Sequence, residues 1–239
     1  MSLSSKHVFF DLDRTLWDFD ENSKVALKQI FSELNLKSIF ETFERFYNAY
    51  AAQNARLWSL YSDGKLTKEV LRYERFNATL NQFNIDNLTL AKEMGGMYVS
   101  LSPFQKRLFP GTIQCLDELK AIGFRLHIIT NGFEEVQFIK LKNCGIANYF
   151  DVVVCSEAVG KNKPSRAIFQ YAMEQAGCKA QDSIMIGDDF RADVSGALNS
   201  GIKAIHFDPH QTSNENYIHT CTHLSQLPEM ITKQLLATT

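Results

Sequence analysis

The sequence contains a series of short apolar runs separated by helical patterns, and this alternation limits the folds that it can adopt. Five runs are rich in β-branched or aromatic residues and are bounded by Gly or charged residues: 7–11, 124–130, 151–155, 183–187 and 202–207. Between them lie helical segments such as 112–123 and 165–177, each of which ends in a Gly. Alternating strands and helices predict an α/β fold, with a doubly wound parallel sheet that carries helices on both faces.

Residues 19–105 follow a different pattern and contain no convincing strand. The stretch is long and polar, and it holds four runs with helical spacing: 25–35, 43–61, 67–80 and 90–101. We therefore expect a helical-bundle insert over 19–105, placed between the first strand and the rest of the sheet. The α/β core would then consist of residues 1–18 and 106–239.

The composition excludes several classes of protein. The 239 residues are 45% apolar with a formal net charge of −2, which predicts an ordinary folded core and no surface for a nucleic acid polymer. No apolar run approaches the roughly 18 residues of a membrane span, so we expect a cytoplasmic protein that does not bind membranes. The five cysteines are scattered and include no Cys-x-x-Cys pair, which argues against disulfides and a zinc site.

Polar residues follow four of the predicted strands at the point where each strand ends. Ligands of parallel α/β sheets bind beyond the carboxyl ends of the strands. In chain order these residues are Asp11, Asp13 and Thr15, then Thr130, Asn131 and Gly132, then Lys163, and finally Asp188, Asp189 and Asp193. Each alone has an ordinary explanation as a turn or helix-capping residue. Together, at four successive strand ends, they predict a functional site.

Asp11 and Asp13 pose a specific physical problem because they lie two positions apart, directly after an apolar run. Their side chains converge only if the chain bends or coils just past Phe10. Two close carboxylates repel each other, so a bound cation, a shared proton or a nearby lysine must compensate.

These four segments together resemble the motifs of the haloacid dehalogenase superfamily. The matching segments are Asp11-Leu12-Asp13-Arg14-Thr15, Thr130-Asn131-Gly132, Lys163-Pro164 and "GDDFRADVSGA" at 187–197. The resemblance covers almost the whole chain. Only thirty residues separate Gly132 from Lys163, so the insert at 19–105 resembles the family's first type of cap.

The resemblance implies hydrolysis of phosphate monoesters through an aspartyl phosphate, a route that suits a nucleophilic carboxylate. Asp11 would be the nucleophile, and Asp13 would protonate the leaving oxygen and then activate water. Mg²⁺ would be held by Asp11, by the backbone carbonyl of Asp13 and by Asp188, and Lys163 would add positive charge. Lys161 competes with Lys163, but a lysine directly before a proline is the family pattern.

The remaining residues of the motifs would support this chemistry. Thr130 and the backbone N–H groups around Asn131 and Gly132 would hold the phosphoryl oxygens, and Thr15 would also contact the substrate. Asp189 and Asp193 would orient metal-bound waters or Lys163. The alternative is that Asp189 contacts the metal directly.

Two residues beside the paired aspartates are candidates for substrate binding. Arg14 stands where many family members have Gly, and it would contact either the substrate or a carboxylate of the cap. Trp17 follows the catalytic loop, and it would either stack on a base or belong to the core.

Within the family that the chain resembles, a carboxylate at the position of Asp13 implies a phosphatase or a phosphomutase. Segments 57–58, 64–76, 129–133 and 156–177 resemble bacterial housekeeping 5′-nucleotidases that act on pyrimidine nucleoside monophosphates. A nucleoside 5′-monophosphate is therefore the expected substrate, with a sugar-phosphate phosphatase or phosphomutase as the alternative. A phospho-Asp signalling receiver or a binding module is the remote alternative. Receivers phosphorylate an Asp that follows the third strand, whereas the paired aspartates of this chain follow the first.

Overall fold

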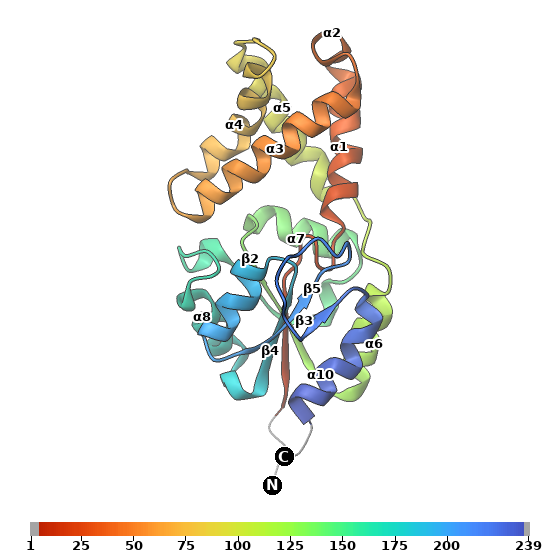
Figure 1. Ribbon diagram of the computed structural model, residues 1–239, viewed down its shortest axis with the longest axis vertical. Coiled ribbons are helices and arrows are strands. Elements are labelled where there is room, and N and C mark those ends of the chain that lie inside the picture. Colours follow the sequence, from red (N-terminus) through yellow and green to blue (C-terminus); the bar gives the residue numbers. More distant parts are fainter. Residues whose placement is uncertain (1–4, 237–239) are drawn as a thin grey trace. The chain divides into compact units, whose positions relative to one another are not determined.

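We describe a computed structural model in which residues 5–236 are placed. The chain divides into two compact units (Figure 1). One comprises the described residues of 1–19 and 106–239, and the other comprises Asp20–Gln105.

The first unit is built on a parallel sheet of six strands in the order β3-β2-β1-β4-β5-β6. The strands are β1 (His7–Phe10), β2 (Arg125–Thr130), β3 (Phe150–Cys155), β4 (Ser183–Gly187), β5 (Lys203–Phe207) and β6 (Thr220–Cys221). This order is that of a doubly wound sheet, so the predicted fold class is confirmed. The short strand β6 was not expected, because two residues carry no periodic signal.

Side chains on the central strand β1 alternate between two cores, one on each face of the sheet. Val8 and Phe10 belong to one core cluster and Phe9 belongs to the other. Helices α6 (Thr112–Ile122) and α10 (Leu227–Leu236) pack on the first face, and α8 (Arg166–Ala176) and α9 (Gly196–Asn199) pack on the second. Because both faces are covered, β1 is fully buried.

Two of the helices in this unit end where their glycines predict. Gly123, after α6, and Gly177, after α8, have φ angles of 100° and 64°, the left-handed region that a side chain disfavours. The remaining long helix, α7 (Glu134–Asn143), follows β2.

The second unit consists of helices with their own core. These are α1 (Phe19–Glu33), whose first residue is the last of the other unit, α2 (Lys37–Phe40), α3 (Phe43–Ser62), α4 (Lys68–Asn81) and α5 (Leu88–Leu101). The side chains of Thr42, Thr67 and Asn87 cap α3, α4 and α5, respectively. The helical insertion was predicted from spacing, but the short α2 was not.

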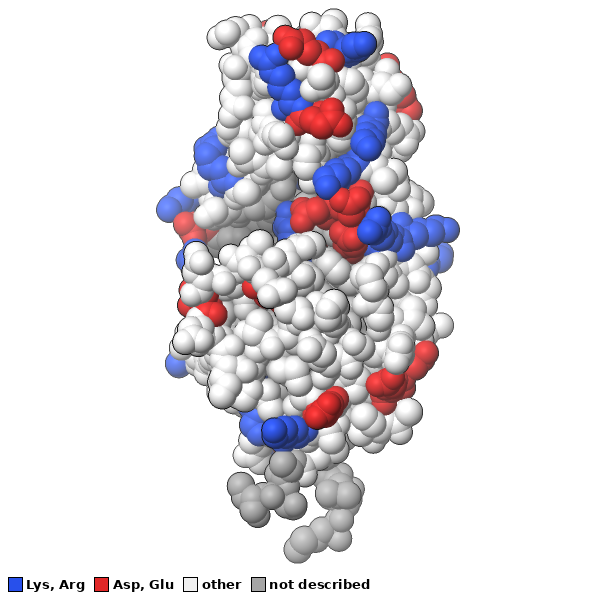
Figure 2. Space-filling view, turned by 45° about the vertical axis from the view of Figure 1, so that its right-hand side comes forward, with Lys and Arg blue, Asp and Glu red and all other residues white. Residues whose placement is uncertain are grey.

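No helix among residues 5–236 is both long and apolar enough to cross a membrane. All five cysteines are free thiols, as the scattered spacing predicted. On the face shown in Figure 2, acidic and basic side chains lie beside one another, in keeping with the small net charge.

Two imidazole rings are buried against each other in the first unit. His7 and His127 stack in the interior, with Nδ1 of His7 and Nε2 of His127 2.9 Å apart. Burial lowers the pKa of both rings, to about 4 for His127, where the neighbouring His7 adds to the effect.

We expect the free energy of unfolding to fall as the pH drops from about 6.5 to about 4. In that range the two histidines are protonated in the unfolded chain but stay neutral in the folded chain. This difference lowers the free energy of unfolding by up to about 3 kcal/mol for His127. Urea unfolding at several pH values checks this, with His127→Leu compared with the wild type. The variant should show a shallower dependence on pH, and parallel profiles would contradict the prediction.

Candidate active site

The loop after β1 turns sharply directly beyond Asp11. The Asp11 N–H donates to the carbonyl of Ile186 on β4 at 2.9 Å, which continues the sheet by one residue. The N–H groups of Leu16 and Trp17 then donate to the carbonyl of Leu12, at 3.0 and 2.8 Å, so the chain coils tightly. The predicted bend past Phe10 is therefore present.

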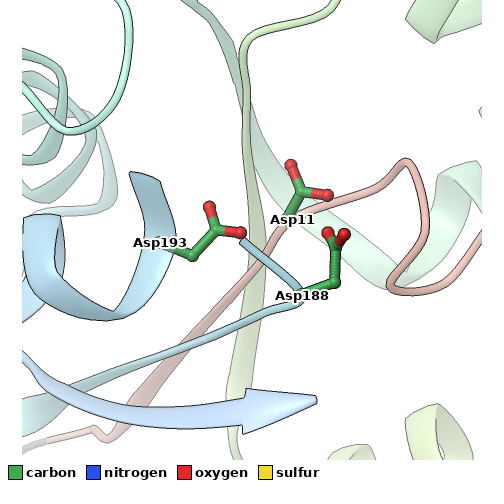
Figure 3. Close-up of side chains that lie close together, drawn as sticks. All are labelled: Asp11, Asp188 and Asp193. Carbon is green, nitrogen blue, oxygen red and sulfur yellow. The ribbon is translucent and has the colours of Figure 1, made fainter. Parts of the chain in front are cut away.

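Three carboxylates meet at the carboxyl edge of the sheet. Asp11 follows β1, Asp188 follows β4, and Asp193 lies on the π-helical turn η5 (Phe190–Ser195) (Figure 3). One oxygen from each of these residues lies within 4.8 Å of the others. We call these residues the carboxylate cluster. Its oxygen donors are of the kind that hard divalent cations prefer, so the cluster could hold a metal ion.

Lys163 is buried against the carboxylate cluster. Its Nζ donates to Asp11 Oδ1 at 2.7 Å, to Asp193 Oδ1 at 2.6 Å and to the carbonyl of Ile129 at 2.8 Å. Only 2% of the residue is exposed. Burial opposes its charge, but the carboxylates of Asp11 and Asp193 outweigh that effect and raise its pKa. The competing Lys161 is exposed.

The carboxylate cluster contains three acidic groups, and Lys163 pairs with two of them. Burial raises the pKa of Asp11 to about 7, with Lys163 opposing the shift and Asp193 adding to it. Burial and the charges of Asp11 and Asp193 also raise the pKa of Asp188, and burial raises that of Asp193. Such shifts mark a place where a further positive charge would be stabilised.

Asn131 and Thr130 stabilise loops of the site. The Asn131 side chain accepts from the backbone N–H of Lys163 at 2.8 Å and donates to its carbonyl at 3.2 Å, so it holds the loop that carries the lysine. The Lys163-Pro164 peptide bond is cis. Thr130 is buried, and its hydroxyl accepts from the N–H of Gly132 at 3.0 Å.

Two residues contact Asp188, whereas the side chain of its neighbour Asp189 makes a different contact. The Thr15 hydroxyl accepts from the N–H of Asp188 at 3.1 Å and lies 3.4 Å from its carboxylate. His206 on β5 contacts the Asp188 carbonyl through Nε2 at 2.9 Å. Asp189 is exposed, and its carboxylate accepts from the N–H of Ala192, so it caps η5 and does not join the carboxylate cluster.

The candidates for substrate binding beside the paired aspartates have other contacts in the structure. Trp17 is completely buried, and Lys140 lies over its ring, 4.1 Å from the centroid. Its ring belongs to the core, which is one of the two alternatives that the sequence left open. Arg14 is exposed, with its guanidinium 4.3 Å from the centroid of the Phe19 ring and a φ of 65°, the conformation for which Gly is suited.

The Asp13 side chain is held by two residues of α7. Lys140 Nζ lies 2.5 Å from Asp13 Oδ1, and Gln137 Nε2 donates to Oδ2 at 2.8 Å. Neither residue was predicted, and neither was His206. The available signal was the spacing of Gln137 and Lys140, three residues apart and thus on one face of a helix that follows a motif.

The fold and the buried group of carboxylates and lysine define an α/β enzyme whose site suits an anionic or metal-bound ligand. The family model for haloacid dehalogenase-like hydrolases matches residues 8–207. The chain therefore belongs to this family of hydrolases.

Known proteins similar to this chain act on different substrates. The pyrimidine 5′-nucleotidase YjjG of Escherichia coli is 32% identical over 231 residues, 96% of each chain. A glyceraldehyde 3-phosphate phosphatase of Methanothermobacter thermautotrophicus is 33% identical over 208 residues, 84% of each chain. The structure of the HAD-hydrolase YfnB from Bacillus subtilis, bound to magnesium, has a TM-score of 0.85 at 24% identity, covering 95% of this chain and 99% of that one.

Proposed function

We propose that this phosphatase hydrolyses nucleoside 5′-monophosphates with a pyrimidine base, through a covalent phosphoryl intermediate on Asp11. The contact of Asp11 with Lys163 at 2.7 Å, inside the carboxylate cluster, is the observation that carries the chemistry. The similarity to YjjG over 96% of the chain supports the choice of substrate. The similarity to a glyceraldehyde 3-phosphate phosphatase supports a small sugar phosphate as the second candidate.

The reaction would proceed in two displacements. A carboxylate oxygen of Asp11 attacks phosphorus, the bond from phosphorus to the ester oxygen breaks, and the Asp13 carboxyl gives its proton to that oxygen. Asp13 then removes a proton from water, whose oxygen attacks phosphorus. The bond from phosphorus to Asp11 breaks, and inorganic phosphate is released.

Lys163 and the loop at Asn131 would bind and orient the phosphoryl group. The ammonium of Lys163 would stabilise the negative charge that develops on the phosphoryl oxygens, because it is fixed and largely desolvated. Asp193 would hold that ammonium in place, since its carboxylate lies 2.6 Å from Nζ. This assignment makes Asp193 a support for the lysine, and it leaves Asp188 facing the reacting carboxylate of Asp11.

The residues present fit a magnesium ion, because buried oxygen donors outnumber the one lysine that contacts them. Asp11, Asp188 and the backbone carbonyl of Asp13 would hold it. Bound there, Mg²⁺ would neutralise charge on the phosphoryl group and the attacking carboxylate. Thr15 and His206, through their contacts with Asp188, would orient this part of the site.

Removing Asp188 should abolish the stabilisation of the protein by Mg²⁺. A ligand that binds only the folded state adds about 2.7 kcal/mol at one hundred times its dissociation constant, so Mg²⁺ should raise the wild-type unfolding temperature. Thermal unfolding with increasing Mg²⁺ checks this for Asp188→Asn. Asp189→Asn is the matched control and should keep the response. If Asp189→Asn loses the response instead, the assignment of the ligands is wrong.

The proposed substrate is tested by measuring phosphate release with Mg²⁺ from pyrimidine and purine nucleoside 5′-monophosphates, sugar phosphates and p-nitrophenyl phosphate. We expect the largest kcat/KM on pyrimidine 5′-monophosphates, with Asp11→Asn as the blank. A preference for triose or other sugar phosphates would support the proposed reaction but contradict the proposed substrate. Absence of release from every ester would overturn the proposal.

A further inference from the structure

Helix α7 buries two of its polar residues and exposes an apolar one. Gln137 and Lys140 are 1% and 3% exposed, whereas Phe138, between them in sequence, is 48% exposed. Burying a lysine in place of a phenylalanine is costly for packing alone, because the ammonium loses its hydration. The orientation of α7 therefore indicates a need for these two polar groups in the interior.

Both buried groups are directed at one carboxylate. Lys140 Nζ lies 2.5 Å from Oδ1 of Asp13, and Gln137 Nε2 lies 2.8 Å from Oδ2, so each oxygen has its own donor. Lys140 also lies over the Trp17 ring, which restricts where its ammonium can go. A carboxylate held through both oxygens is fixed in rotation as well as in position.

The chain makes room for this contact at Gly132. A Cβ atom placed on Gly132 would lie 1.5 Å from Nε2 of Gln137 and 2.5 Å from its Cδ. Any side chain at position 132 would therefore push the Gln137 amide away from its place beside Asp13. The turn after β2 thus leaves room for the Gln137 amide that contacts Asp13.

We propose that Gln137 and Lys140 are positioning residues, which hold the Asp13 carboxyl group in the orientation that transfers protons. In that orientation Asp13 gives its proton to the leaving ester oxygen and later takes one from water. The inference rests on the proposed function, because it assumes that Asp13 is the acid and base. If the contact served only to attach α7 to the loop after β1, its loss would reduce stability and slow all substrates equally.

The leaving group separates these two explanations. p-Nitrophenolate leaves readily without a proton, whereas an alkoxide such as the 5′-oxygen of a nucleoside requires one. Because kcat/KM reports the steps up to formation of the phosphoryl intermediate, it shows this requirement directly. Loss of positioning should therefore reduce kcat/KM for alkyl phosphates far more than for p-nitrophenyl phosphate.

The experiment compares Lys140→Met, Lys140→Arg and Gln137→Met with the wild type on both kinds of ester. In Lys140→Met we expect kcat/KM for a nucleoside monophosphate to fall about 10²-fold, and that for p-nitrophenyl phosphate to fall much less. Lys140→Arg keeps a cation and should recover most of the loss. Lys142→Met, which removes an exposed lysine from the same helix, should behave as the wild type.

Release of p-nitrophenolate in the first turnover gives a second readout. In Lys140→Met the intermediate should form and then persist, because Asp13 is also needed to activate water. We therefore expect a burst of about one equivalent, followed by slow turnover. Gly132→Ala should show the same burst more weakly, because it displaces only Gln137.

Asp13→Asn, measured in parallel, separates failure of this inference from failure of the proposed function. If Asp13→Asn shows the dependence on the leaving group and the Lys140 and Gln137 variants do not, the positioning role is overturned and Asp13 keeps its assignment. If Asp13→Asn shows no such dependence, the assignment of Asp13 is wrong. If the Lys140 and Gln137 variants lose the same factor in kcat/KM on both esters and unfold at a lower temperature, their contact with Asp13 has only a structural role.

Discussion

Asp11→Asn is expected to reduce phosphate release by at least about 10⁴-fold while the protein stays folded. The substitution keeps the shape of the side chain but removes the attacking oxygen, and loss of a nucleophile costs about 10⁶-fold in a well-studied hydrolase. The fold should tolerate the change, because Asn at this position lowers the repulsion in the carboxylate cluster and leaves Lys163 paired with Asp193.

Phosphate release and thermal unfolding, measured on the same preparations, check this expectation. Rapid acid quenching of the wild type during turnover, followed by mass spectrometry, should show one added phosphoryl group on the peptide that contains Asp11. Asp189→Asn is the control, because it removes an exposed carboxylate from the neighbouring loop and should retain most activity. Turnover close to that of the wild type in Asp11→Asn would show that another group attacks phosphorus.

Lys163→Met is expected to damage both activity and stability. Removing the ammonium leaves the carboxylates of Asp11 and Asp193 buried without their cation, and breaking a buried pair in this way costs about 3–5 kcal/mol. Phosphate release should fall by roughly 10²-fold to 10³-fold or more, as for other fixed charges that stabilise a transition state.

Lys161→Met is the matched control for this prediction, since it removes an exposed lysine two residues away. The double variant Lys163→Met/Asp193→Asn should regain part of the lost stability but none of the activity, because the amide removes an unpaired charge and supplies no cation. Urea unfolding and phosphate release measure the two effects. A larger loss of activity in Lys161→Met than in Lys163→Met would show that the wrong lysine has been assigned.

The location of the site was predictable because it depends on local patterns and on topology. Short apolar runs identify strands from a few residues each, and the alternation with helices predicts a parallel sheet. In such a sheet the carboxyl ends of the strands lie on one edge, so Asp11, Asp188 and Lys163 could be brought together from sequence alone. The structure places all three there, with Lys163 in contact with Asp11.

The directions of individual side chains were less predictable. Trp17 was a candidate for stacking on a base, but it is buried in the core. The side chains of Asn131 and Thr15 make hydrogen bonds with Lys163 and Asp188, and neither contact was predicted. A motif shows which residues lie near a site, but rotamers and loop packing decide which atoms point into it.

The α/β class, the helical insertion and the strand ends that carry the chemistry were predictable from the sequence, since each follows from spacing within segments and from their order. The environment of Asp13 was not predictable, because it depends on tertiary packing. Hydrophobicity alone would turn Phe138 of α7 toward the core, yet the helix packs with Gln137 and Lys140 inward. That choice depends on a carboxylate more than a hundred residues earlier in the chain, and no local pattern records the free energy of such a contact.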